Sequence, residues 1–163
     1  MTHPPLEVIV GQQLLNRHLT LATAESCTGG LIGHRLTNVP GSSEYFLGGI
    51  IAYANEIKER VLGVSHQTLE THGAVSAETA SEMARGARRV LGVDLAVSVT
   101  GIAGPGGGTA EKPIGLVYAA LAAPDFERVE RFVWHQDREG NKWESSEAAL
   151  QMVQEYLQGL KPD

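Results

Sequence analysis

The spacing of apolar residues along the chain predicts an alternation of strands and helices. Short apolar, β-compatible runs predict strands at about 19–24, 45–53, 94–100, 114–122 and 128–134. Apolar residues at helical spacing predict helices at about 6–18, 28–36, 55–62, 77–91 and 143–160, with a polar connection and one helical turn at 66–73. Strands that alternate with helices in this way are typical of α/β folds.

The order of these segments predicts one three-layer α/β/α domain over residues 1–163. Its sheet is expected to be mixed and mostly parallel. Only a short turn at Pro124-Asp125 separates the last two strands, which favours their antiparallel pairing. The apolar run 45–53 is too short for a typical buried helix, so we expect it to be a central strand.

Composition and charge narrow the class of protein. With 42% hydrophobic and 20% charged residues, the chain is expected to form a packed core. Its net charge of −6, without a long basic run, argues against nucleic-acid binding. Cys27 is the only cysteine, which excludes an internal disulfide and a cysteine-based metal cage. Neither a signal peptide nor a membrane-spanning run is recognisable, so we expect a soluble, cytoplasmic protein without membrane contact.

A serine lies where the sequence changes abruptly from apolar to polar. The first predicted strand runs into Glu25-Ser-Cys-Thr-Gly-Gly30, and apolar residues at helical spacing follow. A helix N-terminus at this point offers free backbone N–H groups and positive dipole potential to an anion, and the two glycines allow a ligand to approach closely. Taken alone, Ser26 is more simply an N-cap of that helix.

Two further polar clusters follow predicted strands. They are Tyr53-Ala-Asn-Glu-Ile-Lys58 and the glycine-rich Thr100-Gly-Ile-Ala-Gly-Pro-Gly-Gly-Gly108. Ligands of open α/β sheets gather outside the carboxyl ends of strands, so we expect the three clusters to converge. Burial beside a helix N-terminus would lower the pKa of Lys58, which suits a general base for Ser26. Alternatively, Lys58 is a solvated helix residue and Tyr53 a sheet-edge aromatic.

Other reactive residues have structural interpretations. Cys27 is small, and we expect it to be buried rather than nucleophilic. The glycine-rich segment lacks Gly-Lys-Ser/Thr and does not match Gly-x-Gly-x-x-Gly, so neither common phosphate loop is present. The histidines show no metal-ligand spacing, and we expect neither a metal nor a cofactor.

Several long motifs stand in order along the chain. They are Ala24-Glu-Ser-Cys-Thr-Gly-Gly30, Pro40-Gly-Ser-Ser43, Tyr53-x-Asn-Glu-x-Lys58, Gly73-Ala-Val-Ser76, Val99-Thr-Gly-Ile-Ala-Gly-Pro-Gly-Gly-Gly108 and Lys112-Pro-Ile-Gly115. Over about residues 6–160 the chain resembles the CinA C-terminal domain family, whose stand-alone members are nicotinamide-nucleotide amidases of the PncC type. The resemblance implies a three-layer α/β/α fold and a homodimer or larger homo-oligomer.

The resemblance also implies an activity and its residues. The reaction is hydrolysis of the carboxamide of nicotinamide mononucleotide to nicotinic acid mononucleotide and ammonia, in pyridine-nucleotide salvage and without a metal. Ser26 matches the family's nucleophile and Lys58 its base, with Tyr53 and Thr100 nearby as further catalytic residues. The expected substrate-binding residues are Cys27, Thr28, Gly29, Gly30, Asn55, Gly101, Ala103, Gly104 and Arg138.

One motif departs from the family pattern. The family often shows Gly-Asp-Arg and, four residues later, a second arginine, whereas this chain has Gln136-Asp-Arg138 and then Lys142. Arg138 can form a fork with phosphate, but Lys142 offers a point charge only. The departure therefore bears on phosphate affinity more than on the chemistry.

The residues and the resemblance together suggest a mechanism and its rivals. Ser26 attacks the carboxamide carbon with help from Lys58, backbone N–H groups from Cys27 to Gly30 hold the oxyanion, and Lys58 or Tyr53 protonates the departing ammonia. One rival is a nucleotide-binding or regulatory module without turnover, which does not need Lys58 near Ser26. Another is a hydrolase of a different small amide or phospho-compound on the same scaffold.

Overall fold

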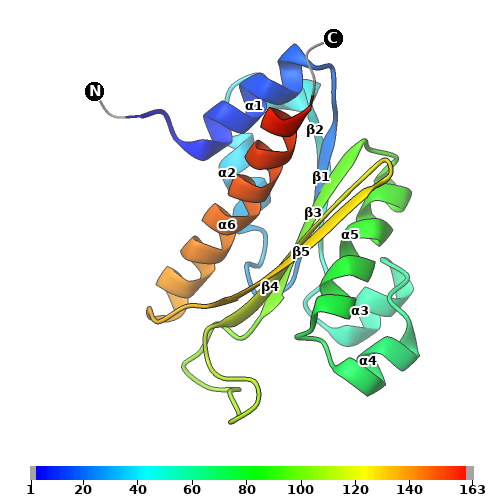
Figure 1. Cartoon of the computed structure of the whole chain (residues 1–163), viewed down its shortest axis with the longest axis vertical. Coiled ribbons are helices and arrows are strands. Elements are labelled where there is room, and N and C mark those ends of the chain that lie inside the picture. The colour runs from blue at the N-terminus through cyan, green and yellow to red at the C-terminus, as the bar shows by residue number, and fades with distance from the viewer. Residues whose placement is uncertain (1–2, 161–163) are drawn as a thin grey trace.

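The computed structural model describes residues 3–160, in which a five-stranded sheet is covered by helices on both faces (Figure 1). The elements are α1 (Leu6–Asn16), β1 (Leu21–Glu25), α2 (Leu31–Thr37), the 3-10 turn η1 (Ser42–Glu44), β2 (Phe46–Ile51), α3 (Asn55–Arg60), α4 (His66–His72), α5 (Ala77–Leu91), β3 (Leu95–Gly101), β4 (Leu116–Ala123), β5 (Phe126–Val133) and α6 (Arg138–Gly159). The predicted three-layer α/β/α class is confirmed.

The sheet is mixed, as the sequence predicts. Its strand order is β2-β1-β3-β4-β5; β1 pairs in parallel with β2 and β3, and β4 pairs antiparallel with β3 and β5. Thus β4 alone runs against the other four strands. Every residue of β1 is buried, as are Leu95–Thr100 of β3, so these two strands form the centre of the sheet.

The strand expected at the centre lies instead at the edge. β2 pairs only with β1, and its side chains alternate between half-buried and exposed, with Leu47 and Ile51 among the exposed ones. An apolar run shows that a strand forms but not which neighbours it has, and this is why the prediction was wrong. A glycine is needed within the strand, because a Cβ on Gly49 would collide with Thr23 Oγ1 of β1.

The helices divide between the two faces of the sheet. α1, α2 and α6 cover one face, and α3, α4 and α5 lie on the other (Figure 1). The larger apolar cluster joins α1, α2 and α6 to the sheet, and a second cluster joins α5 and the α3–α4 segment to it. α5 packs closely because Gly86 faces the Leu62 carbonyl, where no Cβ would fit. Within the described residues, no helix is long and apolar enough to cross a membrane.

A buried arginine fastens the helices of the first face to one another. Arg35 of α2 is 3% exposed, donates to Ser146 Oγ of α6 at 2.7 Å, and pairs with Glu7 of α1 at 2.6 Å. It also pairs with Glu147, and its guanidinium lies 4.2 Å from the centre of the Trp143 ring. α6 is therefore fixed to the helix that follows β1.

Two helix starts and the length of one helix differ from the prediction. α2 begins at Leu31 rather than near residue 28, because the glycines before it adopt positive φ values outside the helix. α6 begins at Arg138, five residues before the expected start, because the Asp137 side chain caps it by accepting from Gly140 N at 2.8 Å. α4 spans seven residues, more than the single turn expected.

Candidate active site

Ser26 follows the last residue of β1 at the carboxyl edge of the sheet. Its backbone N–H donates to the Val99 carbonyl of β3 at 2.9 Å, which holds the residue against the neighbouring strand. Its side chain is 8% exposed. The N-cap of α2 is Gly30, so the interpretation of Ser26 as the N-cap of that helix is wrong.

Lys58, the fourth residue of α3, lies close to Ser26. Its Nζ lies 3.1 Å from Ser26 Oγ and 3.3 Å from the Tyr53 carbonyl oxygen. The side chain is 1% exposed, which contradicts the alternative of a solvated helix residue. Removal of water from the ammonium group lowers the pKa of Lys58 below its ordinary value. A buried lysine that gives up its proton easily, next to a hydroxyl, is equipped to act as a base.

The N-terminus of α2 is not free for an external anion, contrary to the expectation. Ile32 N donates to Glu25 Oε1 at 2.9 Å, and Gly33 N donates to Glu25 Oε2 at 3.0 Å. The chain's own carboxylate thus takes the place that the sequence offered to a ligand. In the preceding turn the N–H groups of Thr28 and Gly30 find no acceptor among residues 3–160.

Cys27 is buried beside the two candidate catalytic groups. It is 7% exposed, and burial raises the pKa of its thiol to about 12. The thiol is therefore neutral at physiological pH. The expectation of a buried, non-nucleophilic cysteine agrees with this environment.

The three predicted clusters converge on one cavity of about 290 Å³. Its lining includes the expected residues Ser26, Cys27, Tyr53, Asn55, Lys58, Thr100, Gly101, Ala103, Gly104 and Arg138. Thr28, Gly29 and Gly30 do not line it. Residues missed by the sequence are Ala74, Val75, Ile102, Gly106 and Gly107. The Gly73-Ala-Val-Ser76 motif and the glycine-rich loop were signals that could have found them.

Thr100 lines the cavity, and its hydroxyl bonds to the segment before α5 rather than to Ser26. It is 1% exposed, and its Oγ1 donates to the Ala74 carbonyl at 2.7 Å. This bond joins the end of β3 to the segment before α5. The next residue must be small, because a Cβ on Gly101 would lie 2.7 Å from the Leu116 carbonyl oxygen.

Residues in the first turn of α6 donate hydrogen bonds to the glycine-rich loop. Arg138 donates through Nη1 to the Gly104 carbonyl at 2.7 Å and through Nη2 to the Tyr53 hydroxyl at 3.1 Å. Asn141, which the sequence did not single out, is 1% exposed and donates to the Ala103 carbonyl at 2.9 Å. Tyr53 itself is 61% exposed, so this pair lies at the mouth of the cavity.

Lys142 lies one helical turn after Arg138 but faces a different part of the site. A Cβ on Gly29 would lie 3.8 Å from Lys142 Nζ, so the ammonium group lies over the turn that follows Ser26. Lys142 does not line the cavity. Of the two cations, Arg138 contacts the glycine-rich loop, and Lys142 lies near Gly29 in the Ser26 turn.

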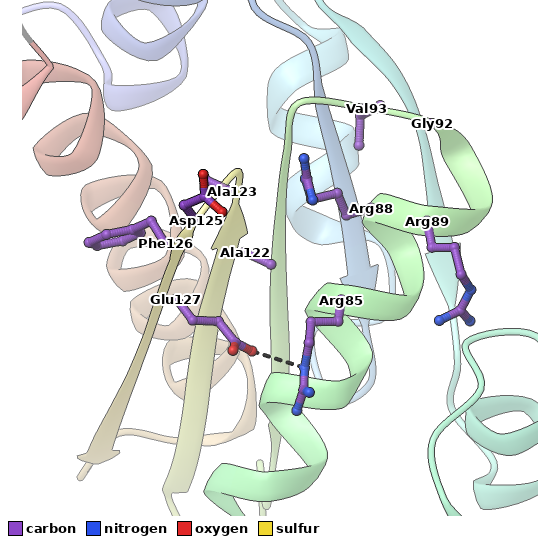
Figure 2. Close-up of a pocket in the computed structure, with 10 residues that line it drawn as sticks. All are labelled: Arg85, Arg88, Arg89, Gly92, Val93, Ala122, Ala123, Asp125, Phe126 and Glu127. Atoms are coloured by element: carbon purple, nitrogen blue, oxygen red, sulfur yellow. Dashed lines mark ion pairs between the residues drawn. The ribbon is translucent and has the colours of Figure 1, made fainter.

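A second cavity, of about 760 Å³, lies at the opposite end of the sheet between α5 and the β4–β5 hairpin (Figure 2). Arg85, Arg88 and Arg89 line it, but their guanidinium groups point in different directions. Arg85 pairs with Glu127 at 3.0 Å, while Arg88 and Arg89 each donate to a backbone carbonyl. The three cations do not converge on one anion.

Among residues 3–160, no group of three or more His, Cys, Asp or Glu side chains is placed to hold a metal ion. The candidate site consists of a serine, a buried lysine, backbone amides and an arginine. These groups are suited to acyl transfer with a phosphorylated or otherwise anionic substrate.

Known proteins share this sequence and fold. The model of the CinA C-terminal domain matches residues 3–157. A CinA-like protein from Chlorobaculum tepidum is 58% identical over 150 residues, which are 89% of this chain and 36% of the relative. One from Chloroherpeton thalassium is 52% identical over 162 residues, 96% of this chain and 38% of the relative. The chain thus spans little more than a third of these curated relatives.

Solved structures agree in length as well as fold. The competence/damage inducible protein CihA from Agrobacterium tumefaciens superimposes with a TM-score of 0.90 at 39% identity, covering 97% of this chain and 99% of that one. A CinA superfamily protein from Klebsiella pneumoniae gives a TM-score of 0.92 at 31% identity, covering 95% and 97%. With a family model that matches almost all described residues, this chain belongs to the CinA C-terminal domain family.

Proposed function

We propose that the chain is a nicotinamide-nucleotide amidase, which hydrolyses the carboxamide of nicotinamide mononucleotide to nicotinic acid mononucleotide and ammonia. The observation that carries the proposal is the 3.1 Å separation of Lys58 Nζ and Ser26 Oγ at the wall of a polar cavity. A binding module has no need of a buried lysine in contact with a serine hydroxyl, since burial of the ammonium group is unfavourable.

The hydrogen bonds of Lys58 define the first step. The neutral amine has one lone pair, which accepts the Ser26 proton, while one of its N–H groups donates to the Tyr53 carbonyl and fixes its orientation. Ser26 Oγ then forms a bond to the carboxamide carbon, and the carbonyl electron pair moves to oxygen. The backbone N–H groups of the turn after Ser26 are the candidate oxyanion donors, and of the residues Cys27 to Gly30 it is Cys27 that lines the cavity.

The remaining steps return the site to its starting state. When the tetrahedral intermediate collapses, the C–N bond breaks and Lys58 gives its proton to the departing amide nitrogen, which leaves as ammonia. A water molecule, deprotonated by the same amine, attacks the acyl-enzyme and releases the carboxylate and Ser26. Arg138 has five N–H donors and uses two of them on Gly104 and Tyr53, so it retains donors for the substrate phosphate.

One assay tests the activity directly. Ammonia release is measured with nicotinamide mononucleotide, nicotinamide riboside and nicotinamide, for the wild type, Ser26→Ala and Lys58→Met. We expect turnover of the phosphorylated compound and a loss of at least about 10³-fold in each variant. Ser42→Ala is a matched control, because Ser42 is 9% exposed and lies in η1, outside the cavity.

The result also distinguishes the rival functions. Binding of the nucleotide without ammonia release would favour a regulatory module, and release from a different amide would favour another hydrolase. Full activity of Ser26→Ala would overturn the mechanism. Self-association into a homodimer or larger assembly stays a prediction, which light scattering on the purified chain tests.

A further inference from the structure

We infer that Glu25 is a positioning residue that fixes the turn between Ser26 and Gly30. This inference rests on the proposed function and adds a residue to it. Glu25 is 2% exposed and accepts from Ile32 N at 2.9 Å, Gly33 N at 3.0 Å and Thr23 Oγ1 at 3.3 Å. Its carboxylate therefore connects the last residue of β1 to the first turn of α2.

The backbone on either side of Ser26 is held independently of this carboxylate. The Glu25 carbonyl accepts from Ala52 N at 2.8 Å, and Ser26 N donates to the Val99 carbonyl at 2.9 Å. The chain is thus fixed to both neighbouring strands where it enters the turn. Where it leaves the turn, the fixed point is the bond of the Glu25 carboxylate to α2. The side chain closes the turn into a loop of defined shape.

Only a carboxylate satisfies every donor at this helix end. Leu31 N donates to the Thr28 carbonyl and His34 N to the Gly30 carbonyl, which leaves Ile32 N and Gly33 N for the two Glu25 oxygens. A glutamine amide has one oxygen, so its NH₂ group would face one of the two backbone donors. An unpaired buried donor and a displaced helix start would follow.

The consequence for chemistry falls on the turn amides. Ser26 Oγ keeps its strand-anchored backbone, but the N–H groups of the turn from Cys27 to Gly30, of which Cys27 lines the cavity, lie between Ser26 and the Glu25 anchor. Displacement of these donors weakens stabilisation of the oxyanion, which appears in kcat. Arg138, which lies on α6, keeps its place, so the KM for a phosphorylated substrate is expected to change little.

The test compares Glu25→Gln with Glu7→Gln. Glu7 of α1 anchors the same helix, through Arg35, but lies outside the cavity, so its variant controls for loss of a partly buried carboxylate that holds α2. Two rates are measured well below the melting temperature of each variant: ammonia release from nicotinamide mononucleotide, and labelling of Ser26 by a serine-directed sulfonyl fluoride, followed by mass spectrometry.

In Glu25→Gln we expect kcat and the labelling rate to fall at least about tenfold, with KM within about threefold of the wild type. In Glu7→Gln both rates stay at the wild-type level. If Glu25→Gln does not fold, Thr23→Val removes one bond to the carboxylate and is expected to slow labelling about two- to threefold.

Unchanged labelling and turnover in the folded Glu25→Gln or Thr23→Val variant overturns the positioning role, as does an equal loss in Glu7→Gln. A wild type that releases no ammonia but is labelled faster than Glu25→Gln refutes the substrate and supports the positioning role. A wild type that is neither labelled at Ser26 nor active overturns both.

Discussion

Lys58 Nζ lies 3.1 Å from Ser26 Oγ, although the two residues are 32 positions apart in sequence and both side chains are buried. Because only the neutral amine can accept the serine proton, activity depends on the protonation of Lys58. Burial lowers the pKa of Lys58, so the neutral form becomes available below its ordinary value of 10.5. This relationship leads to two predictions about pH.

The first concerns activity. We expect kcat/KM for nicotinamide mononucleotide to rise with pH as Lys58 loses its proton, and to level off above its lowered pKa. Lys58→Arg keeps the positive charge but supplies no base, and its activity is expected to fall about 10³-fold at every pH. Rates measured across pH in a constant-ionic-strength buffer check this. The prediction is contradicted if Lys58→Arg keeps high activity and shows the same rise of kcat/KM with pH as the wild type.

The second concerns stability. Between the lowered pKa of folded Lys58 and 10.5, the unfolded chain binds more protons than the folded one, so the free energy of unfolding contributed by this group rises with pH. Lys58→Met removes this rise of the free energy of unfolding with pH. It also removes the cost of burying a charged ammonium group at pH values below the lowered pKa of Lys58. We expect the variant to be inactive but more stable at neutral pH, by about 1 kcal/mol. Urea unfolding of both proteins at several pH values measures this, with Lys112→Met as the control, because Lys112 is half-buried and lies outside the cavity.

Cys27 is expected to be dispensable for chemistry. With its thiol pKa at about 12, Cys27 carries no thiolate at neutral pH. Cys27→Ala should keep kcat within about threefold of the wild type and lose about 1 kcal/mol of stability from the vacated volume. Steady-state kinetics and chemical unfolding measure the two effects. A loss of activity comparable to that of Ser26→Ala would show that the thiol takes part.

Thr100 is expected to act through the wall of the cavity. Thr100→Val removes the donor to the Ala74 carbonyl without changing the side-chain shape, and should cost about 1–2 kcal/mol of stability together with a fall in kcat/KM. Thr100→Ser keeps the hydroxyl and should lie closer to the wild type in both. Similar behaviour of the two variants would show that the Thr100 hydroxyl is not what matters.

Arg138 is expected to determine the preference for a phosphorylated substrate. Arg138→Met should raise KM for nicotinamide mononucleotide about tenfold or more, as expected for loss of hydrogen bonds to a charged group. Any residual turnover of nicotinamide riboside should be unaffected. Tyr53→Phe removes the hydroxyl that Arg138 contacts. Comparison of the two variants separates the effect of the Arg138 guanidinium on KM from the effect of its bond to Tyr53. Equal changes for both substrates would place Arg138 outside the phosphate site.

The sequence predicted the convergence of the site because the carboxyl ends of parallel strands lie at the same edge of the sheet. The clusters after β1, β2 and β3 follow strands that run in the same direction, so they meet at one edge. The edge position of β2 was beyond reach, because a strand's neighbours are chosen by tertiary contacts. Its glycines pack against β1, but an apolar run that contains glycines is compatible with either place.

The missed residues share a physical cause. Glu25 belongs to a polar cluster in the sequence, yet its carboxylate contacts amides seven and eight residues later, after a turn whose shape the sequence does not specify. Asn141 contacts a carbonyl 38 positions away. Arg138 was predicted as a site residue, but it was expected outside the last helix because the cap by Asp137 was not recognised. Such contacts depend on the complete fold.

The place of α6 in the chain has a consequence for biosynthesis. A nascent chain made only as far as β5 already contains Ser26, Lys58 and Thr100, but it lacks Arg138 and Asn141, which hold the glycine-rich loop. It also lacks the helix whose Ser146 and Glu147 contact Arg35 of α2. α6 follows β5 in the chain and completes the cavity, so a growing chain carries its reactive groups before it can use them.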